Sequence, residues 1–198
     1  MFRNKFLMRV LLAGFFAILS GCSATTSMNS EVWKKPDSPV SNMSVLYIHR
    51  EFRSTVDSSV MYGWLNYDQM PKLMKEYAPK VLELNGFSGS RTYSTDGKDS
   101  DYLLVVEFLG SNNMAMHTHG ASVVFMYAEA KLVSRKNNEK IWSIRLSNSM
   151  GMGALNDILF DEQFTYGLME TVLNKMHVDQ IISLNNGKVV MPAQKQSG

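Results

Sequence analysis

The chain contains a single cysteine, Cys22, which lies at the end of a short apolar segment near the N-terminus. Because there is no second cysteine, no disulfide can form within the chain. With 198 residues, the chain is long enough for one domain with a sizeable core. Its fold must therefore be stabilised by packing alone.

Residues 1–21 have the layout of an export signal. Arg3, Lys5 and Arg9 form a basic N-terminal region, and residues 10–19 form an apolar core. As a helix this core would be about 15 Å long, half the hydrocarbon thickness of a bilayer. We therefore expect a cleaved signal peptide over residues 1–21 and not a spanning helix.

Removal of this signal changes the charge of the chain. The whole sequence has 20 basic and 18 acidic residues, and the signal contains three of the basic residues and no acidic one. The remaining 17 basic and 18 acidic residues give a net charge near −1. A nucleic-acid role then has no electrostatic basis, so we expect no nucleic-acid partner.

The signal ends in Leu19-Ser20-Gly21-Cys22, which resembles the lipobox of bacterial lipoproteins. The resemblance implies that the Cys22 thiol becomes a diacylglyceryl thioether before cleavage, and that two or more acyl chains give stable anchoring. Ser23 follows the cysteine in place of aspartate, which by the same resemblance favours the outer membrane, facing the periplasm. The alternative is an ordinary signal peptide that happens to contain a cysteine at this point.

The composition predicts three segments after the signal. Residues 22–44 are dominated by Ser, Thr, Asn and Pro, which predicts a flexible tether with a reach of about 26 Å. Trp33 is the exception, and it could lie at the lipid interface or dock on the domain. We expect the folded domain over residues 45–184 and a loose C-terminal tail over residues 185–198.

The periodicity of apolar residues within the domain predicts strands and helices in turn. Strands are expected at residues 45–52, 102–109, 121–133 and 140–147, with a short extended segment at 90–94, and helices at 68–84 and 161–176. The turn residues 136–139 predict an antiparallel hairpin, and Asn85-Gly86 predicts a helix stop. The fold class is therefore α+β, a single mostly antiparallel or mixed sheet of about five strands with two helices packed on one face.

The element order over residues 45–182 resembles a group of small periplasmic lipoproteins. The matching parts are the helix before Gly86-Phe87, the strand YLLVVEFL, the hairpin AEAKLVSRKNNEKIWS and the closing helix. The group is related in shape to the curli-secretion lipoprotein and to the N-terminal domain of the Tol-system β-propeller protein. The resemblance implies an accessory or assembly role and no enzymatic one.

Two methionine-rich segments could carry chemistry. Met114, Met116, His117 and His119 lie within six residues, and thioether and imidazole are ligands for copper. The alternative is a structural loop, because the chain has 15 methionines overall. Residues 150–153, Met-Gly-Met-Gly, are expected to form either a partner-binding loop or a mobile connection.

The expected function is a lipid-anchored periplasmic accessory or scaffolding protein that binds another envelope component. Its expected partners are the membrane, through the lipid on Cys22, and an unidentified envelope protein. No residues are assigned as catalytic, because Ser88 lacks the surroundings of a nucleophile elbow and no thiol remains free. A copper-binding lipoprotein is the first alternative and an envelope hydrolase the second.

Overall fold

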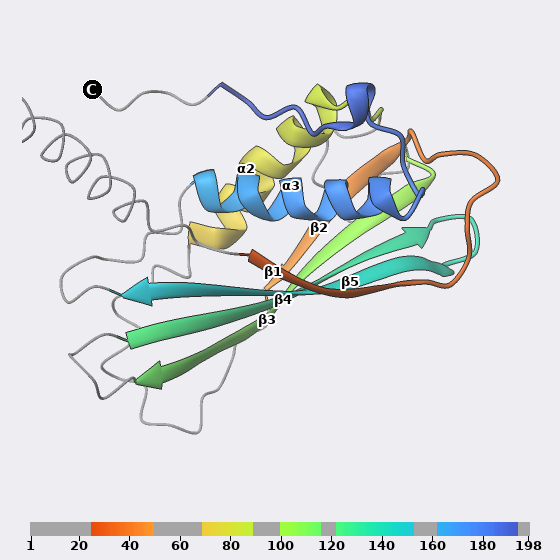
Figure 1. Cartoon of the computed structure of the whole chain (residues 1–198). Coiled ribbons are helices and arrows are strands. Elements are labelled where there is room, and N and C mark those ends of the chain that lie inside the picture. Colours follow the sequence, from red (N-terminus) through yellow and green to blue (C-terminus); the bar gives the residue numbers. More distant parts are fainter. Residues whose placement is uncertain (1–24, 50–68, 89–99, 116–121, 153–161, 194–198) are drawn as a thin grey trace, which may run out of the picture.

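Five strands form one mixed sheet, and two helices cover one of its faces (Figure 1). The computed structural model describes residues 25–49, 69–88, 100–115, 122–152 and 162–193. The strands are β1 (Thr25–Val32), β2 (Met43–His49), β3 (Tyr102–Ala115), β4 (Ser122–Ser134) and β5 (Lys140–Met152). The helices are α2 (Gln69–Leu84), α3 (Glu162–Val178) and a short 3-10 helix, η2 (Asn185–Gly187). The predicted α+β class is confirmed.

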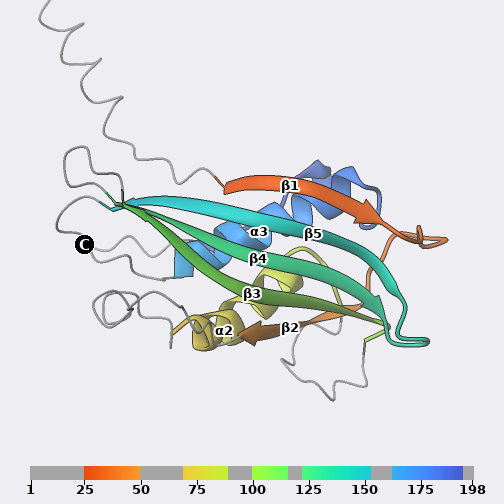
Figure 2. The ribbon, with the colours of Figure 1, turned by 90° about the horizontal axis from the view of Figure 1, so that it is seen from below.

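The strand order is β1-β5-β4-β3-β2, so β1 and β2 form the two edges of the sheet (Figure 2). The predicted hairpin is confirmed, because β4 and β5 pair antiparallel from Val133 opposite Lys140 to Ser122 opposite Met152. β3 pairs antiparallel with β4, and β1 pairs antiparallel with β5. β2 runs parallel to β3, which makes the sheet mixed.

The core lies between the sheet and the helices. One row of side chains crosses four strands in register and is fully buried: Val45, Leu104, Leu132 and Trp142. The methionine content has a partly structural explanation, since five methionines are buried in this core: Met43, Met70, Met74, Met169 and Met176. The flexible thioether side chain suits such irregular space between helix and sheet.

Both long helices end in the same backbone motif. At the end of α2, the Phe87 amide donates to the Leu82 carbonyl and the Gly86 amide donates to the Glu83 carbonyl, with Gly86 at φ 81°. This is a Schellman motif, in which a left-handed residue turns the chain back over the last carbonyls. The predicted helix stop at Asn85-Gly86 is therefore confirmed.

The prediction of a flexible tether over residues 22–44 is wrong for the part that the structure describes. Thr25–Val32 form β1, and further along Val40 and Met43 are buried in the core. A polar sequence can form an edge strand because the stabilising contacts are main-chain hydrogen bonds to a neighbouring strand. Amino-acid composition describes only the side chains, so a prediction based on composition could not detect the main-chain pairing of β1 with β5.

The prediction of a loose tail from residue 185 is also wrong as far as residue 193. Val189 and Met191 pack against the core. The buried Asn85 side chain holds this segment, because its amide donates to the Val190 carbonyl at 2.8 Å and its carbonyl accepts from the Val190 amide at 2.8 Å. The folded domain therefore includes residues on both sides of the predicted 45–184. The expected extended segment at 90–94 and the expected signal lie outside the described residues.

Replacement of Asn85 should loosen the C-terminal segment. Asn85→Ala leaves the Val190 amide and carbonyl without partners, so we expect the free energy of unfolding to fall by about 1–3 kcal/mol. Chemical denaturation measures this loss, and hydrogen exchange of the Val190 amide should accelerate. Lys75→Ala, at an exposed position of the same helix, is the matched control. Equal stability of the two variants would contradict the assignment.

Candidate functional site

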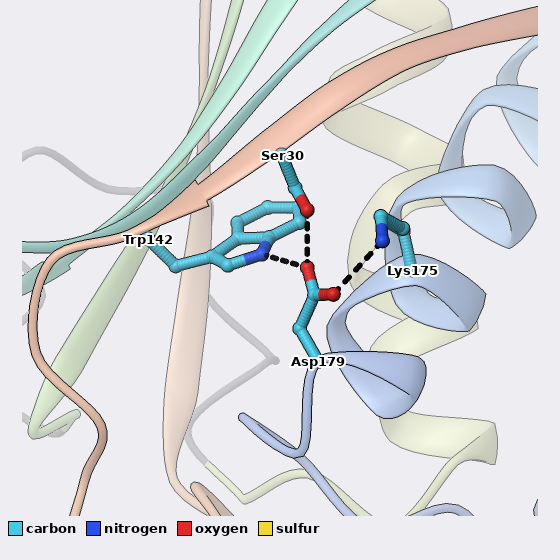
Figure 3. Close-up of polar contacts among 4 residues, drawn as sticks. All are labelled: Ser30, Trp142, Lys175 and Asp179. Atoms are coloured by element: carbon cyan, nitrogen blue, oxygen red, sulfur yellow. Dashed lines mark hydrogen bonds and ion pairs between the residues drawn. The ribbon is translucent and has the colours of Figure 1, made fainter.

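The first strand is attached to the domain by the sheet and by one carboxylate. Asp179 follows the last residue of α3, and Figure 3 shows its side chain between β1, β5 and the helix. One oxygen, Oδ2, accepts from Ser30 Oγ at 2.6 Å and from Trp142 Nε1 at 2.7 Å. The other, Oδ1, accepts from Lys175 Nζ at 2.8 Å. We call these four residues the Asp179 cluster.

The backbone at the end of α3 presents this carboxylate to the sheet. Gln180 has a left-handed φ of 59°, and the Ile181 amide donates back to the Met176 carbonyl. This is the same motif that ends α2, here without a glycine. The turn places Asp179 beside the buried indole of Trp142, whose N–H requires a partner.

Electrostatics favour the ionised form of Asp179. Burial by itself would raise the pKa of this carboxyl group, but hydrogen bonds from Lys175, Ser30 and Trp142, and the charge of Lys175, lower the pKa below its usual value. The cluster is therefore a charged contact that stabilises the fold at neutral pH.

Exposed apolar side chains lie on the two segments that the Asp179 cluster joins. Val32 is 46% exposed, Trp33 is 47% exposed and Val178 is 69% exposed. A hydrogen bond from Lys35 Nζ to Gln180 Oε1 joins the same two segments. We call Val32, Trp33 and Val178 the apolar patch.

Trp33 docks on the domain, which decides between the two alternatives that its position in the sequence left open. Its amide donates to the Ile141 carbonyl at 2.9 Å. Lys140 Nζ lies 3.4 Å from the centre of its ring, a cation–π contact. One face of the indole is therefore occupied by a cation.

The sheet face opposite the helices carries a group of charges. Lys131 Nζ donates to Glu107 Oε2 at 3.1 Å and forms an ion pair with Glu129 Oε2 at 3.0 Å. Burial would lower the pKa of Lys131, but the two carboxylates raise it above the usual value. These charges lie in the half of the strands nearer the β4–β5 turn.

The residues singled out in the sequence lie only partly within the described ranges. Met114 lies in β3 opposite Val123 of β4. Met150 and Met152 belong to β5, so the expected loop at residues 150–153 is instead strand up to residue 152. Cys22, Met116, His117 and His119 lie outside the described residues.

The described parts of the chain contain neither a metal-binding group nor a helix that could span a membrane. No group of three or more His, Cys, Asp or Glu side chains there is placed to hold a metal ion. Within the same ranges no helix has the length and apolar character needed to cross a membrane.

The signals for the Asp179 cluster were only partly visible in the sequence. The spacing of Lys175 and Asp179 is typical of an ion pair along a helix. Ser30 and Trp142 come from strands that are distant in the sequence, and no local pattern relates them to Asp179.

Comparison with known proteins gives structural similarity alone. No protein-family model matches the chain, and no match is found among curated proteins. The chain is similar to the PelC dodecamer from Paraburkholderia phytofirmans, with 12% identity and a TM-score of 0.45, over 73% of this chain and 94% of that one. It is also similar to the lipoprotein GNA1162 from Neisseria meningitidis, with 13% identity and a TM-score of 0.39, over 69% of this chain and 99% of that one. TM-scores and sequence identities this low support no conclusion about function or assembly.

Removal of the Asp179 charge should destabilise the domain in a pH-dependent way. We expect Asp179→Asn to lower the free energy of unfolding at pH 7 by about 1–3 kcal/mol. Because the pKa of Asp179 is lowered in the folded state, its contribution is complete above the unfolded pKa near 4 and is lost as the pH falls through the folded value.

Chemical denaturation of wild type and variant between pH 2 and pH 7 measures this difference. The two curves should converge at the acid end. Glu76→Gln, which breaks an exposed ion pair with Lys80, should change stability by less than about 1 kcal/mol. A constant difference between wild type and Asp179→Asn at all pH values would contradict the assignment.

Proposed function

We propose that this chain is a lipid-anchored accessory protein of the bacterial envelope, attached through Cys22 to the outer membrane and facing the periplasm. Its task is to bind another envelope protein and hold it near the membrane. The observation that carries the proposal is the sequence Leu19-Ser20-Gly21-Cys22 at the end of a basic and apolar leader.

The position of the first strand supports this proposal. β1 begins at Thr25, directly after Cys22, Ser23 and Ala24. The ladder to β5 and the Asp179 cluster attach β1 to the domain. A lipid on Cys22 would therefore be coupled directly to the folded part of the chain.

The apolar patch supports the binding role. Val32 and Trp33 lie at the C-terminal end of β1, so the strand separates them from Thr25 by about 23 Å. Partly exposed aromatic and aliphatic side chains are typical of protein interfaces. A partner bound there would be held on the side of the domain away from the lipid.

A second candidate is copper binding, which rests on the sequence of residues 114–119, Met-Ala-Met-His-Thr-His. The ligands would be Met114, Met116, His117 and His119, as the sequence suggests.

Replacement of Cys22 tests the anchor. Wild-type protein expressed in a Gram-negative host should incorporate labelled palmitate and fractionate with the outer membrane. Cys22→Ala should lose the label and keep its leader, because the thiol that receives the lipid is absent. Cys22→Ser is a conservative control with the same expected outcome. Continued labelling of either variant would refute the anchor.

Photo-crosslinking in intact cells tests the binding role. A photo-reactive residue at position 178 should form a discrete adduct with one envelope protein, identified by mass spectrometry. The same residue at position 75, on an exposed face of α2, should form none. Trp33→Ser should weaken the adduct from position 178. Identical patterns from positions 178 and 75 would count against a partner at the apolar patch.

Titration decides the copper alternative. Calorimetry with Cu(I) and Cu(II) should show binding that the double replacement of His117 and His119 by alanine removes. His177→Gln, in the last turn of α3, is the control and should bind as wild type does. Unchanged affinity in the double variant would exclude this site.

A further inference from the structure

The chain contains two Asn-Gly pairs, Asn85-Gly86 and Asn186-Gly187, which lie in different surroundings. In such a pair the main-chain nitrogen of the glycine can attack the side-chain amide carbon of the asparagine. Glycine favours this reaction because it has no β-carbon to hinder the approach and because its backbone rotates easily. The reaction is intramolecular, so its rate depends on how freely the two groups can reach each other.

The folded structure holds Asn85 away from this reaction. Asn85 is 8% exposed. Its amide nitrogen donates to the Val81 and Val190 carbonyls, and its amide oxygen accepts from the Val190 amide, each at 2.8 Å. The attacking group is also engaged, because the Gly86 amide donates to the Glu83 carbonyl at 3.0 Å. Attack at Asn85 therefore requires the end of α2 and the C-terminal segment to open together.

Asn186 lies on the surface, in the short helix η2 that follows the buried residue Leu184. Asn186 and Gly187 both have a left-handed backbone, with φ 57° and 66°. Within the described ranges no residue forms a hydrogen bond to the Asn186 side chain. The turn is closed by a bond from the Gly187 amide to the Leu184 carbonyl at 3.1 Å and a longer one from the Lys188 amide to the Asn185 carbonyl at 3.4 Å.

Local opening of η2 requires little free energy. The hydrogen bonds of a 3-10 helix have poor geometry, and an exposed single turn is among the parts of a protein that open most readily. Asn186 has ψ 18°. Once the bond to Leu184 is broken, rotation about ψ brings the Gly187 nitrogen toward the Asn186 side chain.

We propose that Asn186-Gly187 is a site of spontaneous covalent modification, at which Asn186 is converted through a succinimide to aspartate and isoaspartate. A bond forms between the Gly187 nitrogen and Cγ of Asn186, the bond from Cγ to Nδ2 breaks, and ammonia leaves with the proton of the Gly187 amide. Water then opens the ring: addition at one carbonyl gives aspartate, and addition at the other gives isoaspartate. The reaction needs neither the lipid on Cys22 nor a partner.

The modification alters the link between α3 and the C-terminal segment. Isoaspartate lengthens the main chain by one carbon, and both products add a negative charge at position 186. Leu184 is buried before this position, and Val189 packs against the core after it. A longer chain between these two fixed points disturbs the hydrogen bonds between Asn85 and Val190.

Peptide mass spectrometry of the purified full-length protein, incubated at neutral pH, measures the conversion of amide to acid at each site. We expect conversion at Asn186 to be at least about tenfold faster than at Asn85, where three side-chain hydrogen bonds must break. In denaturant the two sites should react at similar rates, because only the folded structure protects Asn85. Asn186→Gln, whose longer side chain must form a larger ring, should remove the fast site.

Equal rates at Asn85 and Asn186 in the folded protein, or no conversion at Asn186, would overturn the assignment of the site. Hydrogen exchange tests its consequence, because the Val190 amide should exchange faster in the isolated isoaspartate form than in the unmodified protein. Asn186→Asp, which carries the charge on an unaltered main chain, is the matched control and should exchange as wild type does. Unchanged exchange in the isoaspartate form would refute the effect on the C-terminal segment.

Discussion

One carboxylate, shared by three parts of the fold, joins β1 to the helix layer. Trp142 is fully buried, and its indole N–H finds an acceptor in Asp179. Asp179 is itself mostly buried, so its charge is tolerated because Ser30, Trp142 and Lys175 all donate to it. Each group compensates for the burial of another. The edge strand, the hairpin and the last helix are therefore joined through one shared contact.

The N-terminal segment is fixed to the domain by this shared contact and by the ladder to β5. The segment was expected to float as a coil, but its backbone adds a fifth strand to the sheet and leaves residues 22–24 before Thr25. Thr25 pairs with Asn148 near the C-terminal end of β5, whereas the charges of Glu107, Glu129 and Lys131 lie nearer the other end of the strands.

Much of the fold could be predicted because its signals are local. The hairpin has turn residues between two alternating strands, and its partner positions follow from the turn. The stop of α2 at Gly86 needs a residue that adopts positive φ easily, and glycine does so. The polar edge strand and the C-terminal segment were missed for the opposite reason. β1 is held by main-chain pairing with β5, and residues 189–191 are held by the Asn85 side chain from 105 positions earlier, so neither shows a periodic apolar pattern.

The sequence by itself determined the α+β class, the hairpin, both helices and the motif around Cys22, because each depends on neighbouring residues. Only the tertiary structure decided that Ser30 and Trp142 meet at Asp179, that β2 lies parallel to β3, and that β1 pairs with β5. Those contacts join residues far apart in the chain, and their energies depend on burial and hydrogen-bond geometry that exist only after packing. The same packing places Thr25 beside Asn148 of β5, a relation that no local pattern in the sequence contains.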